Sequence, residues 1–237
     1  MRAGYVAVAS YYPVRSGHCQ RLAGRPVLWQ DTCIMTAPRF EYRALKYEHL
    51  DRWISYYRQI HELLSLEPEN ALEIGKGSGL VGNVLKFRGL DLTSLDNDPG
   101  LSPDIVGSVT SMPIADKAFD VTLCAEVLEH LPFEEFPKAL SEIRRVTRRA
   151  VVLSLPHWGW TFSFAFKLPL LPRVEWCWKL DGLKRHPPGG DHFWEIGKRG
   201  YPLRRISDAI ASAGFRLRAT YLKPDSPYHR FFLLEIA

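Results

Sequence analysis

The chain has 237 residues, of which 46% are hydrophobic and 24% are charged. These proportions are ordinary for a soluble globular protein and argue against a disordered or fibrous chain. The length suits one sizeable α/β domain with an elaboration. The formal net charge of +5 would suit nucleic acid or an anionic membrane surface as a partner.

The distribution of charge weakens the nucleic-acid interpretation. Residues 1–34 hold four arginines and one aspartate, so they contribute +3 and leave +2 for the rest of the chain. The one dense basic run closes a predicted helix, where cations suit the helix dipole and solvent. Its members are Arg144, Arg145, Arg148 and Arg149. We therefore expect a structural role for this run and no nucleic-acid partner.

The cysteines and the apolar stretches indicate in which cellular compartment the protein is expected. None of the four cysteines forms a C-x-x-C pair, so neither a zinc site nor a disulfide framework is indicated, and we expect a cytoplasmic protein. The first residues make a poor signal peptide, because tyrosine, serine and proline break their apolar run. Pro156 and His157 interrupt the apolar stretch 150–166, so no transmembrane helix is predicted.

The chain divides into a peripheral extension and one domain. Residues 1–38 lack a sustained period, so we expect a loosely packed extension there and a domain over residues 39–237. Met35 is an alternative start, from which a shortened chain should still fold. Apolar residues at helical spacing from Leu50 to Leu64 predict an amphipathic helix over residues 44–66.

Strands and helices then alternate, which predicts βαβ units and a largely parallel sheet. Strands are expected at residues 71–74, 92–95, 120–124 and 150–155, with helices at residues 80–87 and around residues 136–143. Residues 156–200 are rich in proline and aromatic residues and predict an insertion over the sheet edge. A helix begins at Pro202, and the strand-like runs 216–222 and 230–236 predict a terminal antiparallel pair.

The sharpest local feature is the segment LEIGKGSG at residues 72–79. Glycines between a strand and a helix allow positive φ and close approach of a ligand. Asp96, at the end of the next strand, can accept hydrogen bonds from ribose hydroxyls. Residues 77–82 also fit the dinucleotide pattern G-x-G-x-x-G, but Glu73 inside the first strand suits a cationic ligand better than a pyrophosphate.

Several segments together resemble class I S-adenosylmethionine methyltransferases, in particular the type-11 group. They are LEIGKGSG, LTSLDND, DIVGSVTSMPIADKAFDVTLCAEVLEHLP and RRAVVLSLP, over about residues 70–156. The resemblance implies a Rossmann-like fold with a seven-stranded sheet. It also implies S-adenosylmethionine as cofactor, bound by Glu73, Gly75, Lys76, Gly77, Asp96, Asn97, Ser108, Val109, Ala125 and Glu126. Serine at 108 and lysine at 76 depart from what is common in the family.

Methyl transfer from a sulfonium mainly requires that the acceptor nucleophile is aligned with the methyl group. A general base is needed only where the acceptor must lose a proton. His157 and His192 are candidate catalytic residues, each also compatible with a structural role, whereas His130 is expected to pack or cap. The cluster Asp191, His192 and Glu195 is a weak metal signal, and no metal is predicted.

Every second residue from Trp158 to Phe166 is aromatic. This alternation predicts a strand packed in the core, with a lid over an apolar acceptor or a contact with a bilayer surface as the alternatives.

The expected function is methyl transfer to a small-molecule acceptor. Three alternatives stay open: methylation of RNA, methylation of a membrane-associated lipid or quinone, and a non-catalytic adaptor that kept the fold. A basic groove beside the donor site would favour RNA, and the aromatic insertion favours the lipid or quinone. Intact Glu73 and Asp96 argue against the adaptor.

Overall fold

The computed structural model describes residues 49–187 and 190–237. The predicted extension 1–38 and the alternative start at Met35 lie outside these residues, so both stay predictions. Seven strands form one sheet in the order β3-β2-β1-β4-β5-β9-β8. The neighbours from β3 to β5 pair in parallel, whereas β9 is antiparallel to both β5 and β8. The predicted mostly parallel sheet with a terminal antiparallel pair is confirmed.

The strands of this sheet are short where they are parallel and long where the chain closes. Their bounds are β1 Asn70–Ile74, β2 Asp91–Asp96, β3 Ile105–Val106, β4 Phe119–Ala125, β5 Thr147–Pro156, β8 Phe215–Lys223 and β9 Ser226–Ile236. The order reverses between β1 and β4, which both run parallel to their neighbours. In open α/β sheets a ligand cleft forms at the carboxyl ends of the strands at such a reversal.

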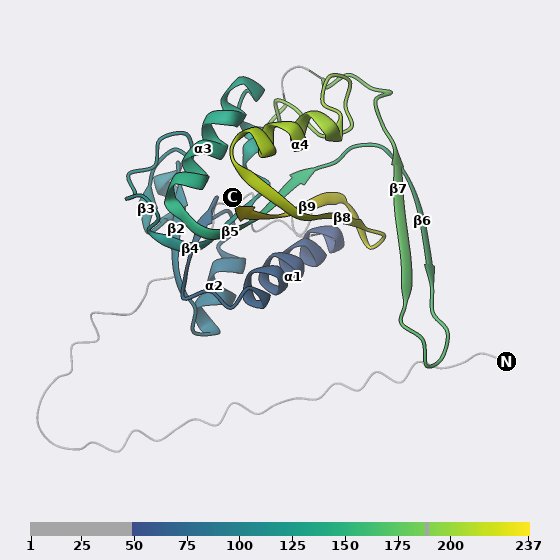
Figure 1. The fold of residues 1–237 in the computed structure, drawn as a ribbon, viewed down its shortest axis with the longest axis horizontal. Coiled ribbons are helices and arrows are strands. Elements are labelled where there is room, and N and C mark those ends of the chain that lie inside the picture. Colours follow the sequence, from purple (N-terminus) through teal and green to yellow (C-terminus); the bar gives the residue numbers. More distant parts are fainter. Residues whose placement is uncertain (1–48, 188–189) are drawn as a thin grey trace, which may run out of the picture. The chain divides into compact units, whose positions relative to one another are not determined.

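Helices cover both faces of the sheet (Figure 1). The helices are α1 Leu50–Ser65, α2 Leu80–Phe87, α3 Phe136–Val146 and α4 Leu203–Ser212. Two hydrophobic clusters lie on opposite faces. Leu63 and Leu85 of α1 and α2 belong to one cluster, and Phe136 and Ile206 of α3 and α4 belong to the other. The sheet is therefore buried on both faces, as its apolar parallel strands require.

Helix α1 buries only part of the side that its apolar spacing suggested, since Ile60 and Leu64 pack against the core but the residues that precede them in this spacing do not. Leu50, Trp53 and Tyr57 are exposed, whereas Ser55 and Gln59 are buried and hydrogen-bonded to each other at 3.2 Å. The polar residues are buried because this side of α1 forms a wall of the cavity described below. Periodicity alone could not show that a helix in this domain turns a polar stripe inward.

The insertion forms a second sheet of two antiparallel strands, β6 Trp160–Phe166 and β7 Val174–Leu180. Its aromatic residues are exposed, so the prediction that they pack in the core is wrong. The hairpin reaches the main sheet near the edge strand β8, where Lys223 Nζ pairs with Glu175 at 3.2 Å. Among the described helices, none is both long and apolar enough to span a membrane.

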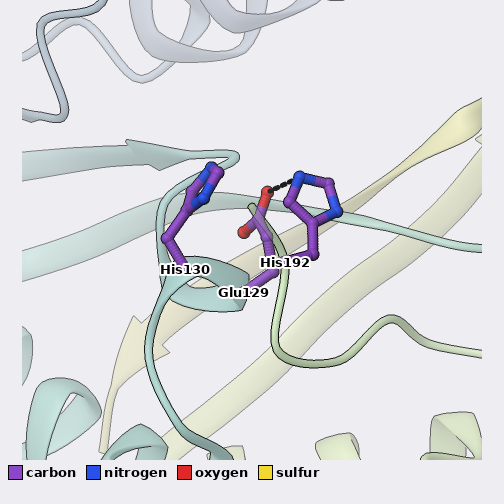
Figure 2. Close-up of side chains that lie close together, drawn as sticks. All are labelled: Glu129, His130 and His192. Carbon is purple, nitrogen blue, oxygen red and sulfur yellow. Dashed lines mark ion pairs between the residues drawn. The ribbon is translucent and has the colours of Figure 1, made fainter. Parts of the chain in front are cut away.

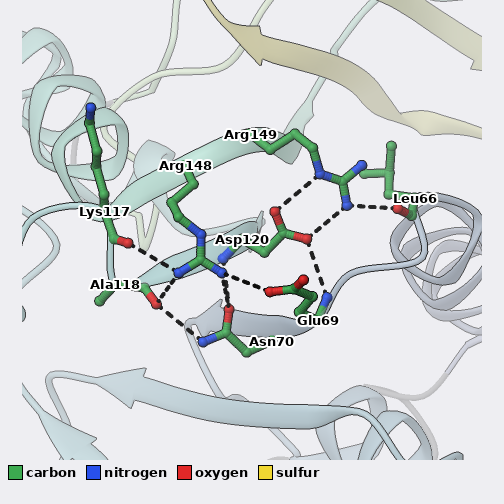
Figure 3. Close-up of polar contacts among 8 residues, drawn as sticks. All are labelled: Leu66, Glu69, Asn70, Lys117, Ala118, Asp120, Arg148 and Arg149. Atoms are coloured by element: carbon green, nitrogen blue, oxygen red, sulfur yellow. Dashed lines mark hydrogen bonds and ion pairs between the residues drawn. The ribbon is translucent and has the colours of Figure 1, made fainter.

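The basic run spans the end of α3 and the start of β5, and its last two members, Arg148 and Arg149, make structural contacts at the amino edge of the sheet (Figure 3). Arg149 donates to both carboxylate oxygens of Asp120 at 3.1 and 2.8 Å, and Arg148 donates to the Asn70 side chain at 3.0 Å. Arg145 pairs with Glu142 and Asp116, each at 2.7 Å. These contacts agree with the structural role expected for the run, and they lie at the edge opposite the cavity.

Candidate functional site

A cavity of about 420 Å³ opens at the carboxyl ends of β1, β2 and β4. Its volume lies within the usual range for small-molecule sites. All ten residues proposed to bind the cofactor contribute to its lining: Glu73, Gly75, Lys76, Gly77, Asp96, Asn97, Ser108, Val109, Ala125 and Glu126. The fold thus brings together segments separated by up to fifty residues, while their contacts with the donor remain predictions.

The turn after β1 is shaped by its glycines. Gly75 has φ +83°, and a Cβ there would lie 2.3 Å from Cγ2 of Val127, so any other residue would displace Val127 and strain the backbone. Gly77 also has positive φ, at +51°, but no atom lies within 4 Å of its Cβ position. A ligand can therefore approach the backbone at Gly77, whereas Gly75 is needed to pack the turn against the segment after β4.

Asp96 connects the turn to the end of β2. One carboxylate oxygen accepts the amide N–H of Lys76 at 2.8 Å, and the other accepts that of Asp98 at 2.9 Å. Each oxygen keeps a lone pair for a further donor, such as a ribose hydroxyl. Asp98 itself accepts from the amide of Gly100 at 2.9 Å, so its carboxylate serves the following turn.

The two departures from the family pattern have local explanations. The Lys76 ammonium donates to the carbonyl of Ser102, so its charge lies against the loop after β2. The Ser108 hydroxyl lies 2.9 Å from that of Thr110 and accepts the amide of Thr110 at 3.2 Å. This serine therefore stabilises its own turn and still borders the cavity.

Two carboxyl groups in the cavity lining, those of Glu73 and Glu126, suit a positively charged ligand. Burial raises the pKa of Glu73 to about 8, and burial raises that of Glu126 to about 7. Glu126 has φ +54°, a strained conformation for a residue with a side chain, and it accepts from Ser154 Oγ at 2.8 Å. A cationic ligand would favour the ionised form of both groups. The charge of the lining thus fits a sulfonium and an ammonium group.

A second group of polar residues consists of Glu129, His130 and His192, which lie close together (Figure 2). Ligand atoms of Glu129, His130 and His192 lie within 4.8 Å of one another, and His192 Nε2 is 4.0 Å from the Glu129 carboxylate. Burial, together with the nearby Glu126, raises the pKa of Glu129 well above its usual range. Neither of its oxygens accepts a hydrogen bond from another side chain. This set of ligand types could also hold a divalent cation.

His130 opens to the cavity and has a defined tautomer. Its Nδ1 lies 2.7 Å from the carbonyl of Asp191, which can only accept, so Nδ1 carries the hydrogen. Partial burial lowers the pKa of His130, so the ring is neutral and its Nε2 has a free lone pair. Of the two histidines proposed as catalytic, His192 lies next to His130, with ring centroids 4.9 Å apart.

The other candidate, His157, lies, like His192, outside the cavity lining. Its Nδ1 accepts from Arg230 at 2.9 Å, and its Nε2 lies 3.4 Å from Asp181. Burial lowers its pKa to about 3, with Arg230 adding to the effect. These contacts favour the structural role that the sequence left open for His157, in which the ring joins β5, β9 and the hairpin.

Sequence reasoning missed several residues of the cavity wall. Arg52, Tyr56 and Gln59 come from α1, and His229 comes from β9. His229 Nδ1 lies 2.8 Å from Ser226 Oγ, and burial lowers its pKa to about 3. Helix α1 precedes every motif that could be recognised, and β9 is distant in sequence. Only their packing against the carboxyl edge assigns them to the site.

The fold and the cavity define a nucleoside-binding α/β domain, with a glycine turn after β1 and an acid after β2 at one sheet edge. Residues 72–155 match the family model described as a methyltransferase domain. These residues are therefore similar to the methyltransferase domain of that family, which uses S-adenosylmethionine as its cofactor.

Known proteins support this assignment. A demethylmenaquinone methyltransferase of Thermotoga maritima is 28% identical over 129 residues, which are 46% of this chain and 56% of that protein. The match thus spans about half the length of that relative.

Two solved structures share the fold at low sequence identity. Magnesium protoporphyrin IX methyltransferase of Synechocystis, with S-adenosylhomocysteine bound, has a TM-score of 0.56 and 13% identity over 79% of this chain and 84% of its own. The 1,6-didemethyltoxoflavin-N1-methyltransferase of Burkholderia thailandensis has a TM-score of 0.55 and 12% identity, over 83% of this chain and 84% of its own.

Proposed function

We propose that the protein transfers a methyl group from S-adenosylmethionine to a small-molecule acceptor. The observation that carries this proposal is one cavity whose lining holds groups for both partners. The glycine turn, Glu73 and Asp96 suit the amino-acid and ribose parts of the donor, and Glu126 adds a second carboxyl group for its positive charge. His130 and His229 in the same lining are polar groups left for an acceptor. The named relatives act on compounds of small-molecule size, which supports the same class of acceptor.

The residues of the cavity would act mainly by positioning. The donor supplies an electrophilic methyl group on a good leaving group, so alignment of the acceptor contributes most. Helix α1 and the segment after β4 both contribute side chains to the lining of the cavity. We assign His130 Nε2 as the group that accepts a proton from an acceptor hydroxyl or amine, because its tautomer leaves that nitrogen unprotonated.

One observation favours a second acceptor class, a membrane-associated lipid or quinone. The aromatic face of the β6–β7 hairpin is exposed, and the hairpin begins a few residues after the carboxyl end of β5. RNA is less favoured, because the described basic run is engaged in structural contacts away from the cavity. We also propose a cytoplasmic location, supported by the free thiols of Cys124 and Cys177.

The first experiment is calorimetry with S-adenosylhomocysteine and, separately, with NAD. We expect heat from the first ligand and none from the second, and binding of NAD alone would overturn the proposal. The second experiment incubates the protein with donor labelled in its methyl group and with a cell extract divided into small-molecule, lipid and RNA fractions. Label in the small-molecule fraction supports the proposal. Label only in another fraction selects that alternative, and donor binding without any transfer identifies an adaptor.

A further inference from the structure

The β6–β7 hairpin has one entirely apolar face. The directly opposed pairs are Trp160 with Leu180, Phe162 with Trp178, Phe164 with Trp176, and Phe166 with Val174. Opposed residues of an antiparallel pair lie on the same face, and alternate residues of a strand share that face. All eight side chains therefore lie together, and each is between 36% and 60% exposed.

In a soluble sheet the apolar side chains are usually buried and the polar ones exposed, and β7 shows the reverse pattern. On β7 the polar positions Glu175, Cys177 and Lys179 are partly buried, whereas the apolar residues between them are exposed. Glu175 pairs with Lys223 of β8, and Lys179 donates to the carbonyl of His157. The β7 half of the polar face is thus held against the domain, whereas Thr161, Ser163 and Ala165 of β6 on the same face are exposed. Figure 1 shows the hairpin extending beyond the main sheet.

An exposed apolar surface of this size indicates that another molecule covers the aromatic face of the hairpin. The six aromatic rings alone leave on the order of 600 Å² of apolar surface, given about 200 Å² for a whole aromatic side chain. That lies at the upper end of the range for the largest apolar patch of a monomeric protein, about 300–600 Å², and patches of this size often mark interaction sites. A two-stranded hairpin is also marginal by itself in water, so its face gains stability when it is covered.

The tip and the charges of the hairpin indicate what covers it. The connection between the strands, KLPLLPR at residues 167–173, exposes Leu168, Leu171 and a fully exposed Leu170 between Lys167 and Arg173. Residues 160–173 contain no acidic residue, and Arg173 pairs with Glu175 of β7 at 2.8 Å. Over residues 160–187, five basic residues face two acidic ones, a balance of +3 within a chain of net charge +5.

We propose that this hairpin docks the protein on the surface of an anionic phospholipid bilayer. The leucines of the tip and the aromatic face enter the interface, and Lys167 and Arg173 meet the phosphate groups. Tryptophan favours this boundary because its ring is apolar and its N–H is polar. A second copy stacked face to face would cover the rings but would not use the apolar tip, whereas a bilayer accommodates both. Attraction of the basic residues to anionic lipid adds to the apolar contribution.

Flotation of the full chain with vesicles tests the proposal. We expect at least about tenfold stronger partition to vesicles of equal parts phosphatidylcholine and phosphatidylglycerol than to phosphatidylcholine alone, given the usual contribution of each basic residue. The double variant Phe164→Ser with Trp176→Ser should weaken partition at least about tenfold. Leu170→Asp should also weaken it, and Lys167→Glu with Arg173→Glu should remove the preference for anionic lipid.

Two controls keep the result decisive. Phe87→Ser changes an even more exposed aromatic residue on α2, outside the hairpin, and should partition like the unaltered protein. Calorimetry with S-adenosylhomocysteine shows whether each variant keeps its folded cavity. Docking on the hairpin is disproved if the protein ignores anionic vesicles, or if the hairpin variants partition unchanged because residues 1–48 carry the binding. It is also disproved if the face proves to be a dimer contact, seen as a dimer in light scattering that Phe164→Ser with Trp176→Ser dissociates.

Discussion

The amide of Lys76 donates to the carboxylate of Asp96 at 2.8 Å, so the end of β2 and the glycine turn after β1 are held as one unit. The other oxygen of Asp96 accepts the amide of Asp98. Asp96 therefore organises two loops of the cavity as well as presenting acceptor sites to it. Its loss should disturb both the binding of the nucleoside and the shape of the turn.

Asp96→Ala should weaken the binding of S-adenosylhomocysteine by about 2–4 kcal/mol, or roughly thirty- to a thousandfold, because charge-assisted hydrogen bonds are lost. Asp96→Asn should weaken it less, since the amide keeps one acceptor. Asp98→Ala is the matched control, and it should change the affinity little, because Asp98 serves its own turn. Calorimetry measures all three. Equal losses in both alanine variants would mean that general electrostatics, not a ribose contact, explain the effect.

The affinity for S-adenosylmethionine should rise with pH up to about 8, because that is the pKa of Glu73 in the free protein. A cationic ligand binds the ionised carboxylate, so binding below this pH releases a proton and costs up to about tenfold in affinity per pH unit. Calorimetry in buffers of different ionisation enthalpy counts the protons. Glu73→Gln should bind more weakly and remove its share of the pH dependence. An unchanged pH profile in that variant would show that Glu73 is not the group that titrates.

The same raised pKa makes a prediction for the stability of the free protein. Between the ordinary carboxyl pKa of 4.5 and about 8, the folded state holds a proton on Glu73 that the unfolded chain has lost. Ionising this buried group opposes folding, so its contribution to stability is present at low pH and is lost as the pH rises through this window. Chemical denaturation of the unaltered protein and of Glu73→Gln, compared across this range, measures the contribution.

Gly75→Ala and Gly77→Ala separate packing from backbone conformation in the glycine turn. Both residues have positive φ, but only at Gly75 would the added methyl meet a neighbour, Cγ2 of Val127 at 2.3 Å. We expect Gly77→Ala to cost about 1–2 kcal/mol of folding free energy, the usual penalty of this conformation, and Gly75→Ala to cost more. Chemical denaturation measures both. A similar cost for the two variants would show that Val127 moves aside easily.

Asp120→Asn should destabilise the protein by about 1–3 kcal/mol near neutral pH, because it weakens hydrogen bonds from Arg149 to a charged group. Those hydrogen bonds lower the pKa of Asp120 below 3.8. The stabilisation is therefore present above about pH 4 and is lost as the pH falls through the lowered pKa. Glu69→Gln is the control, since its exposed carboxylate lies 3.8 Å from Arg148 and should contribute less than about 1 kcal/mol.

His130→Ala should lower the turnover of any identified acceptor that loses a proton by about a hundred- to ten-thousandfold, the usual contribution of a general base. Binding of S-adenosylhomocysteine should hardly change. Chelation of divalent cations should leave the rate of the unaltered protein as it was. Loss of activity on chelation would instead assign Glu129, His130 and His192 to a metal ion, which would orient the acceptor.

The sequence by itself determined the order of the helices and of the main-sheet strands other than β3, together with the glycine turn and Asp96, but it did not predict β3, β7 or the pairing of β7 with β6. The predicted features depend on local properties: hydrophobic period, glycine at positive φ, and an acid at the end of a strand. The resemblance of residues 70–156 then assigned all ten candidate cofactor residues, which the structure brings to one cavity.

Only the tertiary structure decided which side of α1 is buried, that the aromatic strand is exposed, and that Glu129, His130 and His192 meet. A strand in which apolar and other residues alternate has the same sequence pattern whether its apolar face packs in the core or contacts another molecule. The fully buried Trp194 donates to the carbonyl of Leu131 at 3.1 Å and holds the return of the insertion beside the segment after β4. Such contacts between distant segments depend on packing, which no local pattern encodes.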